Sequence, residues 1–222
     1  MSNFYTSETS ELIEISPTLR VRIVADSDPM SPTDWDNLGE IAYNSRYCLG
    51  TEEVSQDRMD EIASGIRKGE LVGLPVYAYV HSGATINTRP FSCPWDSGMS
   101  GFVYCSVEQA RAEFNGRNFK AKARKCLEQE VKTFDQYLTG DVWGFIVEVR
   151  VNEDEDEDAE WENIDSCWGF YGLEYAIEEG TSAGKYQLEQ LLIEAAAQKE
   201  AEIKEAAERK ACEERDIMTV TW

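Results

Sequence analysis

Apolar and polar residues alternate along several stretches of the chain, and a period of two is typical of half-buried β-strands. The clearest alternation is Leu19–Ala25, where apolar side chains are interleaved with arginine. Two apolar and aromatic stretches bounded by glycine, 74–80 and 101–105, predict buried strands. Residues 142–151 show the strongest strand pattern, and residues 161–171 are expected to return beside them as a hairpin.

Other stretches repeat apolar residues at the helical period of 3.6. Residues 54–68 predict a short amphipathic helix, and residues 119–138 predict a longer one; both are expected to end at a glycine. Ser106 is expected to cap a helix over residues 107–114. Residues 185–215 are almost entirely helix-favouring and contain no Pro or Gly, which predicts a long helix.

Together these elements predict an α+β fold with a mixed, mainly antiparallel sheet, helices on one face and a long C-terminal helix. The expected domain organisation is an α+β domain over residues 1–183 and an acidic helical extension over residues 184–222. Residues 81–100 are expected to form a loop between two strands. A chain of 222 residues with 11% aromatic residues can bury a core, which excludes a disordered acidic protein.

The formal net charge of −22 is the most unusual property of the composition. Residues 1–90 carry 14 acidic against 7 basic side chains, residues 91–150 carry 8 against 8, and residues 151–222 carry 21 against 6. Within the middle segment, basic residues between 111 and 125 surround a single acid, Glu113. Direct binding to nucleic acid is not expected of so acidic a chain, because affinity for phosphate comes from Lys and Arg.

An acidic protein can instead present carboxylates to the basic groove of a nucleic-acid-binding protein, or its charge can serve solubility alone. No stretch approaches the roughly 18 apolar residues of a membrane helix, and the N-terminus lacks the layout of a signal peptide. The expected location is therefore the cytoplasm of a host cell. The six cysteines form no CxxC pair, so free thiols are expected rather than a zinc site or a disulfide framework.

The segment after Asn152 concentrates carboxylates in what is expected to be a solvated loop. In an extended strand, side chains on one face lie about 6.6 Å apart, which is comparable to the phosphate spacing of nucleic acid. The predicted partner-binding residues are Glu153, Asp154, Glu155, Asp156, Glu157, Asp158, Glu160 and Glu162.

Calcium binding is an alternative for the same segment, because Asp154, Asp156 and Asp158 occupy the first, third and fifth positions of a helix-loop-helix calcium loop. The pattern then departs from that loop. Ala159 stands where the sharp turn requires glycine, and Asp165 stands where a bidentate glutamate is expected. No metal and no cofactor is therefore predicted.

The single histidine, His81, is the one candidate around which enzyme chemistry could be built. It could act as general base for Cys93 or Ser97 in a Cys/Ser hydrolase, with Asp96 orienting the imidazole. In the reading that we favour, His81 and Asp96 satisfy backbone groups in a tightly folded loop, and the aromatic residues and prolines of this segment pack against the sheet.

A second enzyme alternative comes from the order of motifs in residues 77–114. A strand that ends in His81-Ser82-Gly83, followed by the strand 101–105 and a helix with alanines, resembles ADP-ribosyltransferases. That resemblance implies a histidine and an aromatic-bearing strand that hold NAD. No catalytic glutamate is assignable in this chain.

A set of short motifs resembles a family of small proteins from bacteriophages and mobile elements, over roughly residues 20–173. These motifs are residues 34–39 (DWDNLG), 46–50 (RYCLG), 81–83 (HSG), 90–98 (PFSCPWDSG), 135–140 (DQYLTG) and 165–172 (DSCWGFYG). The resemblance implies a phage or plasmid origin rather than a particular activity. It also implies an acidic residue before the histidine, where this chain has Val80, and this departure argues against an Asp–His pair.

A phage origin combined with the acidic composition predicts an anti-defence inhibitor without catalytic activity. In this hypothesis the carboxylates of Glu153 to Glu162 and of the C-terminal helix mimic nucleic acid and block a basic groove in a host restriction or CRISPR enzyme. The alternatives are an enzyme centred on His81 and a scaffold or adaptor that recruits a partner, or a second copy, through the helix 185–215.

Overall fold

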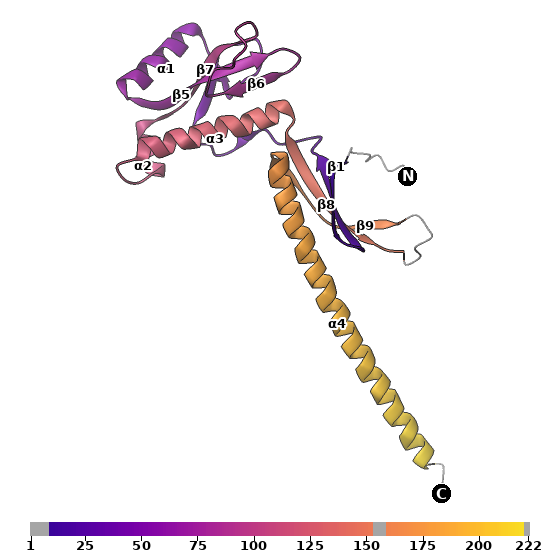
Figure 1. Ribbon diagram of the computed structural model, residues 1–222. Helices are drawn as coiled ribbons and strands as arrows, with labels where there is room; N and C mark the ends of the chain where they lie inside the picture. The colour runs from indigo at the N-terminus through magenta and orange to yellow at the C-terminus, as the bar shows by residue number, and fades with distance from the viewer. Residues whose placement is uncertain (1–8, 153–158, 220–222) are drawn as a thin grey trace. The chain divides into compact units, whose positions relative to one another are not determined.

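The structure confirms the predicted α+β fold class. The computed structural model describes residues 9–152 and 159–219, in which helices accompany two mainly antiparallel sheets (Figure 1). Within these ranges, no helix combines the length and the apolar character that a membrane crossing requires. The predicted C-terminal helix is present as α4 (Leu173–Thr219).

The chain folds as two compact units. The central unit comprises residues 25–144 and 168–175. The hairpin–helix unit comprises residues 1–24, 145–167 and 176–222, and thus contains most of α4. The domain boundary expected between residues 183 and 184 lies inside α4, so the two observed units differ in their residues from the two expected domains.

The hairpin–helix unit is built on a four-stranded sheet in the order β1-β2-β8-β9. Its strands are β1 (Thr9–Ser16), β2 (Leu19–Ala25), β8 (Val142–Arg150) and β9 (Trp161–Tyr171). β1 and β2 are antiparallel, with Glu14 opposite Arg20 and Leu12 opposite Arg22. β9 lies beside β8, which confirms the pairing predicted from the sequence.

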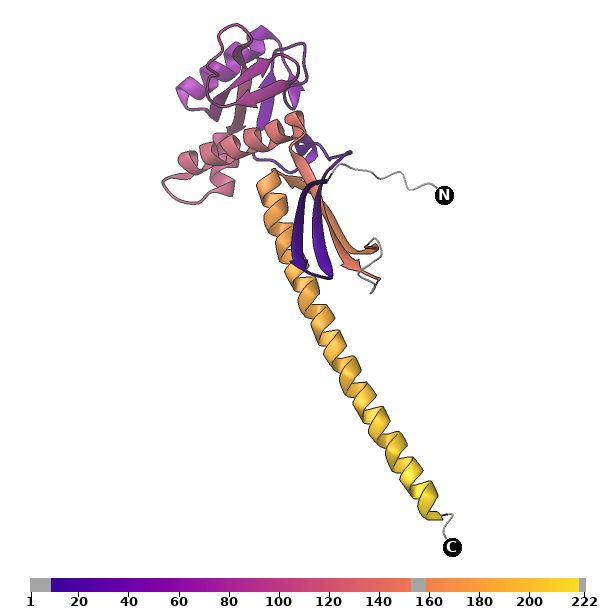
Figure 2. The ribbon, with the colours of Figure 1, turned by 45° about the vertical axis from the view of Figure 1, so that its right-hand side comes forward.

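Helix α4 approaches this sheet through glycines. A Cβ atom on Gly184 would lie 2.7 Å from Val21 Cγ2 and 2.9 Å from Ile15 Cγ1, and one on Gly180 would lie 3.0 Å from Phe145 Cβ. The early turns of α4 therefore belong to the same core as β1 and β2. Farther along, α4 extends beyond the sheet, as both views show (Figures 1 and 2).

The central unit contains a five-stranded sheet in the order β4-β3-β7-β5-β6, in which only β3 and β4 are parallel. The strands are β3 (Glu40–Tyr43), β4 (Glu52–Glu53), β5 (Leu71–Val80), β6 (Ala84–Asn87) and β7 (Ser97–Ser106). The helical elements are η1 (Pro32–Asp34), α1 (Gln56–Lys68), α2 (Val107–Glu113) and α3 (Phe119–Thr139).

Helices cover both faces of this sheet, whereas the sequence analysis placed them on one face. On one side, α3 packs its buried residues Ala123, Leu127, Val131 and Phe134 against the sheet core, together with α2. On the other side, α1 buries Met59 and Ile62 against alternate residues of β3 and β7. Strands buried on both faces require this arrangement, because successive side chains point to opposite sides.

Helix boundaries follow local signals. Ser106 and Gln109 form a complete capping box at the start of α2, as expected from Ser106. Gly69 and Gly140 end α1 and α3 with φ values of 76° and 73°, a left-handed conformation that glycine adopts at little cost.

The strands β1, β3, β4 and β6 were not predicted, and the segment 81–100 is not a continuous loop. β6 lies inside it, and β7 begins at Ser97 rather than Gly101. β6 and the start of β7 become strands by pairing with β5, for example Ser97 opposite Tyr79. β1 pairs instead with β2, and β3 pairs with β4 and β7. Their own sequences carry too few alternating positions to show a strand pattern.

The described cysteines agree with the expectation of free thiols. Cys48, Cys93, Cys105, Cys126 and Cys167 are all unbridged.

Candidate functional site

The residues proposed for enzyme chemistry lie near one another in the chain but form no hydrogen-bonded constellation. His81 is exposed at the end of β5, and its backbone N–H donates to the carbonyl of Gly83 at 3.1 Å. Asp96 is exposed and accepts, through its carbonyl, from the backbone N–H of Val80 at 2.9 Å. The Ser97 hydroxyl donates to the carbonyl of Cys93. In the described chain, no hydrogen bond links the His81 imidazole to the other three.

The hollow beside His81 also lacks the candidate nucleophiles. This open depression of about 370 Å³ is lined by Tyr79, residues 81–85, Leu138 and Thr139. One expected packing contact is present, because Phe91 lies 6.0 Å from Tyr79 between ring centroids. Trp95, which was expected to pack against the sheet, is instead 90% exposed. The hydrogen bonds of His81 and Asp96 described above are made by their backbone groups, so the predicted role of their side chains in satisfying the backbone stays a prediction.

The described residues on either side of the acidic segment are hydrogen-bonded to each other. Residues Glu153 to Asp158 of this segment lie outside the described residues, whereas Glu160 and Glu162 are described and exposed. The N–H of Val151 donates to the carbonyl of Glu160 at 3.0 Å. The Asn152 Oδ1 atom accepts from the Glu160 N–H at 3.0 Å and from Arg150 Nε at 3.1 Å. Val151 and Asn152, which precede the acidic segment, are thus both hydrogen-bonded to Glu160 at its other end.

The sheet beneath this hairpin contains a buried charge cluster that the sequence analysis did not identify. Glu148 on β8 is 7% exposed and accepts from Arg20 Nε at 2.7 Å and from Arg22 Nε at 2.9 Å. The Arg20 guanidinium also lies 4.0 Å from the ring centroid of Trp161, a cation–π contact. These contacts connect side chains of β2, β8 and β9 and thereby stabilise the sheet from which the hairpin extends.

The distal part of α4 carries mixed charge rather than a single acidic face. Every side chain from Leu192 to Lys210 is exposed, and basic residues alternate with the glutamates in this stretch. Arg209 and Glu205 form an ion pair at 2.5 Å with i,i+4 spacing. Such pairing is typical of a solvent-exposed helix and is unlike a regular row of phosphates.

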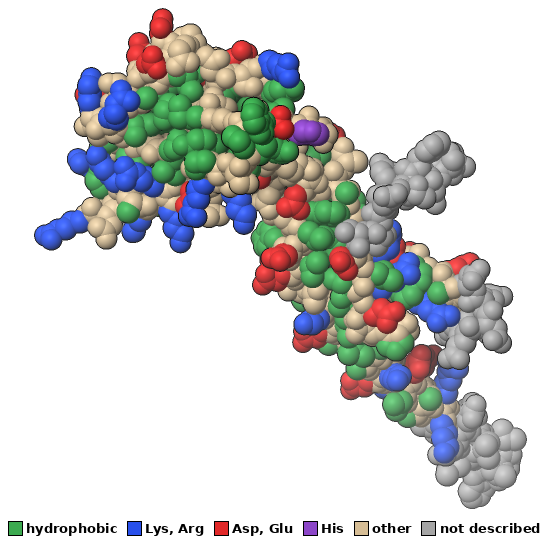
Figure 3. Space-filling model, turned by 45° about the horizontal axis from the view of Figure 1, so that its top comes forward, with side chains coloured by type: hydrophobic (Ala, Val, Ile, Leu, Met, Phe, Trp, Pro, Cys, Tyr) green, Lys and Arg blue, Asp and Glu red, His purple; other side chains and the backbone are tan. Residues whose placement is uncertain are grey.

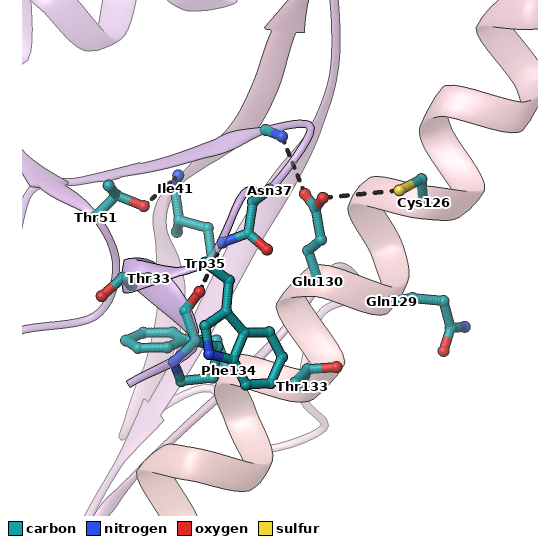
Figure 4. Close-up of a pocket in the computed structure, with 12 residues that line it drawn as sticks. Thr33, Trp35, Asn37, Ile41, Thr51, Cys126, Gln129, Glu130, Thr133 and Phe134 are labelled. Carbon is teal, nitrogen blue, oxygen red and sulfur yellow. Dashed lines mark hydrogen bonds between the residues drawn. The ribbon is translucent and has the colours of Figure 1, made fainter. Parts of the chain in front are cut away.

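In the central unit, a cavity of about 180 Å³ lies between the segment 32–41 and α3 (Figure 4). At its edge the Glu130 carboxylate accepts from the backbone N–H of Leu38 at 2.7 Å and of Gly39 at 3.1 Å, and from the Cys126 thiol at 3.7 Å. Trp35 and Phe134 supply apolar walls. Glu130 therefore fastens the segment before β3 to helix α3.

Burial has the largest effect on the pKa values of Glu130, Cys126 and Cys105. It raises the pKa of Glu130, and the hydrogen bonds from Leu38, Gly39 and Cys126 oppose that shift. Burial and the nearby Glu130 carboxylate also raise the pKa of the Cys126 and Cys105 thiols to about 11. Both thiols are thus poor nucleophiles at neutral pH, since the thiolate is the reactive form. Glu130 acts here as a structural anchor.

Replacing Glu130 with Gln should lower the free energy of unfolding by about 1–3 kcal/mol at neutral pH, because the amide group would face a backbone N–H with no acceptor. The raised pKa means that the folded state holds this proton more tightly than the unfolded state. The stabilisation linked to this proton is therefore full below about pH 4.3, the unfolded value, and is lost as the pH rises through the raised pKa.

Urea unfolding of wild type and Glu130→Gln, from below about pH 4.3 to neutral pH, measures the loss of stability and its dependence on pH. The difference in free energy of unfolding between the two proteins should narrow as the pH rises. Glu128→Gln is the matched control, because the Glu128 side chain is 42% exposed and forms an ion pair with Arg89 at 3.8 Å. Equal losses for the two variants would show that Glu130 is no anchor.

The sequence does contain a signal for Glu130. Glu130 follows Leu127 by three residues and precedes Phe134 by four, which places a carboxylate beside the apolar stripe of a helix.

Within the described ranges, no group of three His, Cys, Asp or Glu side chains is arranged to hold a metal ion. Comparisons with protein-family models, with curated protein sequences and with solved structures found no match to this chain.

Proposed function

We propose that this protein acts by binding another protein, through the acidic hairpin formed by β8 and β9. The partner in this proposal is a basic nucleic-acid-binding protein of the host, of the restriction or CRISPR type. The chain would be a phage-type anti-defence inhibitor that occupies the groove in place of nucleic acid. No reaction is catalysed in this mechanism.

The observation that carries the proposal is the closure of the hairpin around the acidic segment. Asn152 and Glu160 are hydrogen-bonded to each other, and the Glu148 cluster supports the strands below them. Eight carboxylates therefore belong to a segment whose two ends are held by one sheet. Carboxylates flanked by strands of one sheet can be presented to a basic cleft, and charge complementarity then favours the encounter.

The charge of the hairpin gives the proposal its main test. Replacing Glu153, Asp154, Glu155, Asp156, Glu157 and Asp158 by their amides should weaken partner binding at least tenfold, because charge attraction supplies most of the recognition. Wild-type binding should also weaken strongly between about 50 mM and about 300 mM salt, where the Debye length shortens. Affinity capture from a bacterial lysate at both salt concentrations, followed by quantification of the captured protein, measures both.

Capture alone is not sufficient, so the captured protein must bind nucleic acid and must release it when this chain is added. A variant of α4 with Glu200→Gln, Glu202→Gln and Glu205→Gln is the matched control, because it removes carboxylates from another surface. The proposal would be contradicted if the amount of captured protein did not depend on salt. It would also be contradicted if the hairpin variant and the α4 variant weakened capture equally.

A second candidate function is that of an adaptor that recruits a partner through α4. The observation that favours it is the exposure of Leu192, Ile193 and Ile203, which are 63%, 57% and 71% exposed. Large apolar side chains on a solvent-facing helix are common at partner interfaces. In the same capture experiment, replacing these three residues with Ser should abolish adaptor binding while leaving hairpin-dependent binding unchanged.

A further inference from the structure

The central unit carries a basic surface that contrasts with the acidic chain as a whole (Figure 3). The surface is formed by the end of α1, by α2, by the α2–α3 connection and by the start of α3. We call it the basic surface, and its members are Arg67, Lys68, Arg111, Arg117, Lys120, Lys122, Arg124 and Lys125.

Specific contacts bring these helix ends together. The Lys120 Nζ atom donates to the carbonyl of Gly69 at 3.1 Å, which joins the first turn of α3 to the C-terminal cap of α1. The Arg111 guanidinium of α2 lies 5.1 Å from the ring centroid of Phe119 in the same turn of α3. Because Gly69 directly follows Arg67 and Lys68, the basic residues of all three helices share one region.

Arg67, Lys68 and Arg111 lie in the last turns of α1 and α2, where the helix dipole favours basic residues. Neither the dipole nor ion pairing explains the basic start of α3. The first turn of α3 contains Lys120 and Lys122 and no acidic residue, although the helix dipole favours acidic residues at that end. Among the described residues, none of the eight basic side chains forms a salt bridge. A surface that carries repulsion of this kind is best explained by an anionic partner.

Carboxylates border the basic surface on both sides. Beside Lys68, a hollow is lined by Asp57, Asp60, Glu61 and Glu70 of the α1 region. Near the α2 side, another hollow is lined by residues that include Asp36, Glu113 and Glu130. The phosphate track of a nucleic acid would run on into these carboxylates and be repelled. A short acidic peptide segment matches the bounded surface better.

We propose that the basic surface binds the acidic hairpin of a second copy of this chain. The hairpin has eight carboxylates between Glu153 and Glu162, which matches the eight basic side chains of the surface. The contact joins different surfaces of the two copies and is therefore head-to-tail, so it extends to chains or rings as the concentration rises. Since the same hairpin is the proposed partner-binding element, self-association competes with partner binding.

Sedimentation velocity on the full chain tests the proposal. Wild type should associate at about 50 mM salt, with the apparent dissociation constant rising about tenfold by about 300 mM salt. One variant reverses the surface with Lys122→Glu, Arg124→Glu and Lys125→Glu, and a second carries the six amide substitutions in the hairpin. Each variant alone should remain monomeric. A mixture of the two should form one-to-one heterodimers, because each retains the half that the other has lost.

The control variant reverses the same number of charges on α4, with Lys199→Glu, Lys204→Glu and Lys210→Glu, and should associate like wild type. A monomeric wild type at low salt, or a mixture that does not form heterodimers, would overturn the proposal. Association of wild type only after addition of DNA would instead assign the surface to nucleic acid and also overturn it. Failure here leaves the proposed function intact, since the surface variant keeps its acidic hairpin for partner capture.

Discussion

Replacing Glu148 with Ala should lower the free energy of unfolding of the hairpin–helix unit by about 3–5 kcal/mol, the largest single loss that we expect in this chain. Glu148 is buried, and the side chains of Arg20 and Arg22 that it contacts are only 23% and 24% exposed. Without the carboxylate, two guanidinium groups lose their shared acceptor in a poorly solvated position. Urea unfolding and amide hydrogen exchange of β2 and β8 measure the loss.

Two control variants separate the charge effect from simple truncation. Glu14→Ala removes an exposed carboxylate from the neighbouring strand and should change stability by no more than about 0.5 kcal/mol. Replacing all three members of the cluster with apolar residues, as Arg20→Met, Arg22→Met and Glu148→Leu, should recover most of the stability, because no guanidinium is then left without the Glu148 carboxylate. A Glu148→Ala protein as stable as wild type would show that the cluster contributes nothing.

Replacing Gly180 with Leu should destabilise the contact between α4 and its sheet by about 1–3 kcal/mol or more. A single Cβ atom at this position would already lie 3.0 Å from Phe145 Cβ and 3.1 Å from both Ile23 and Val21 side chains. These neighbours are buried, so they have little space into which to move. The helix must shift away from the sheet, and protection of the α4 amides near Gly180 against hydrogen exchange should fall.

Ala195→Leu is the matched control for this substitution, because it adds a similar side chain to an exposed position of the same helix. It should leave stability within about 0.5 kcal/mol of wild type. Gly180→Ala tests the size dependence, since the gain in helix propensity of about 1 kcal/mol offsets the tighter contact. Similar losses for Gly180→Leu and Ala195→Leu would mean that the glycine is not needed for close packing.

The elements that the sequence predicted well are those with local causes. The helix from Val107 to Glu113 begins where Ser106 and Gln109 cap each other, three residues apart. α1 and α3 end at Gly69 and Gly140 because glycine adopts the left-handed conformation there. Strands such as Leu19–Ala25 were predicted because alternation is visible within the strand itself.

The elements that the sequence missed depend on distant partners. β6 and the first part of β7 are strands because β5 pairs with both. For the candidate enzyme site, proximity in the chain suggested a constellation, but the Ser97 hydroxyl donates to the carbonyl of Cys93, and the Asp96 carbonyl accepts from the N–H of Val80. Glu130 was missed because the backbone N–H groups that donate to it, those of Leu38 and Gly39, lie about ninety residues earlier in the chain.

The amino-acid sequence by itself determined the α+β class, the long C-terminal helix and the concentration of negative charge, because propensity, periodicity and composition are properties of the chain alone. Only the tertiary structure decided which charges meet. Glu148 pairs with Arg20 across 128 residues, and Lys120 reaches Gly69 across 51. Such contacts depend on strand order and helix packing, and many arrangements of the elements are compatible with the same local sequence pattern. The fold therefore places a bounded basic surface on a chain whose composition is acidic.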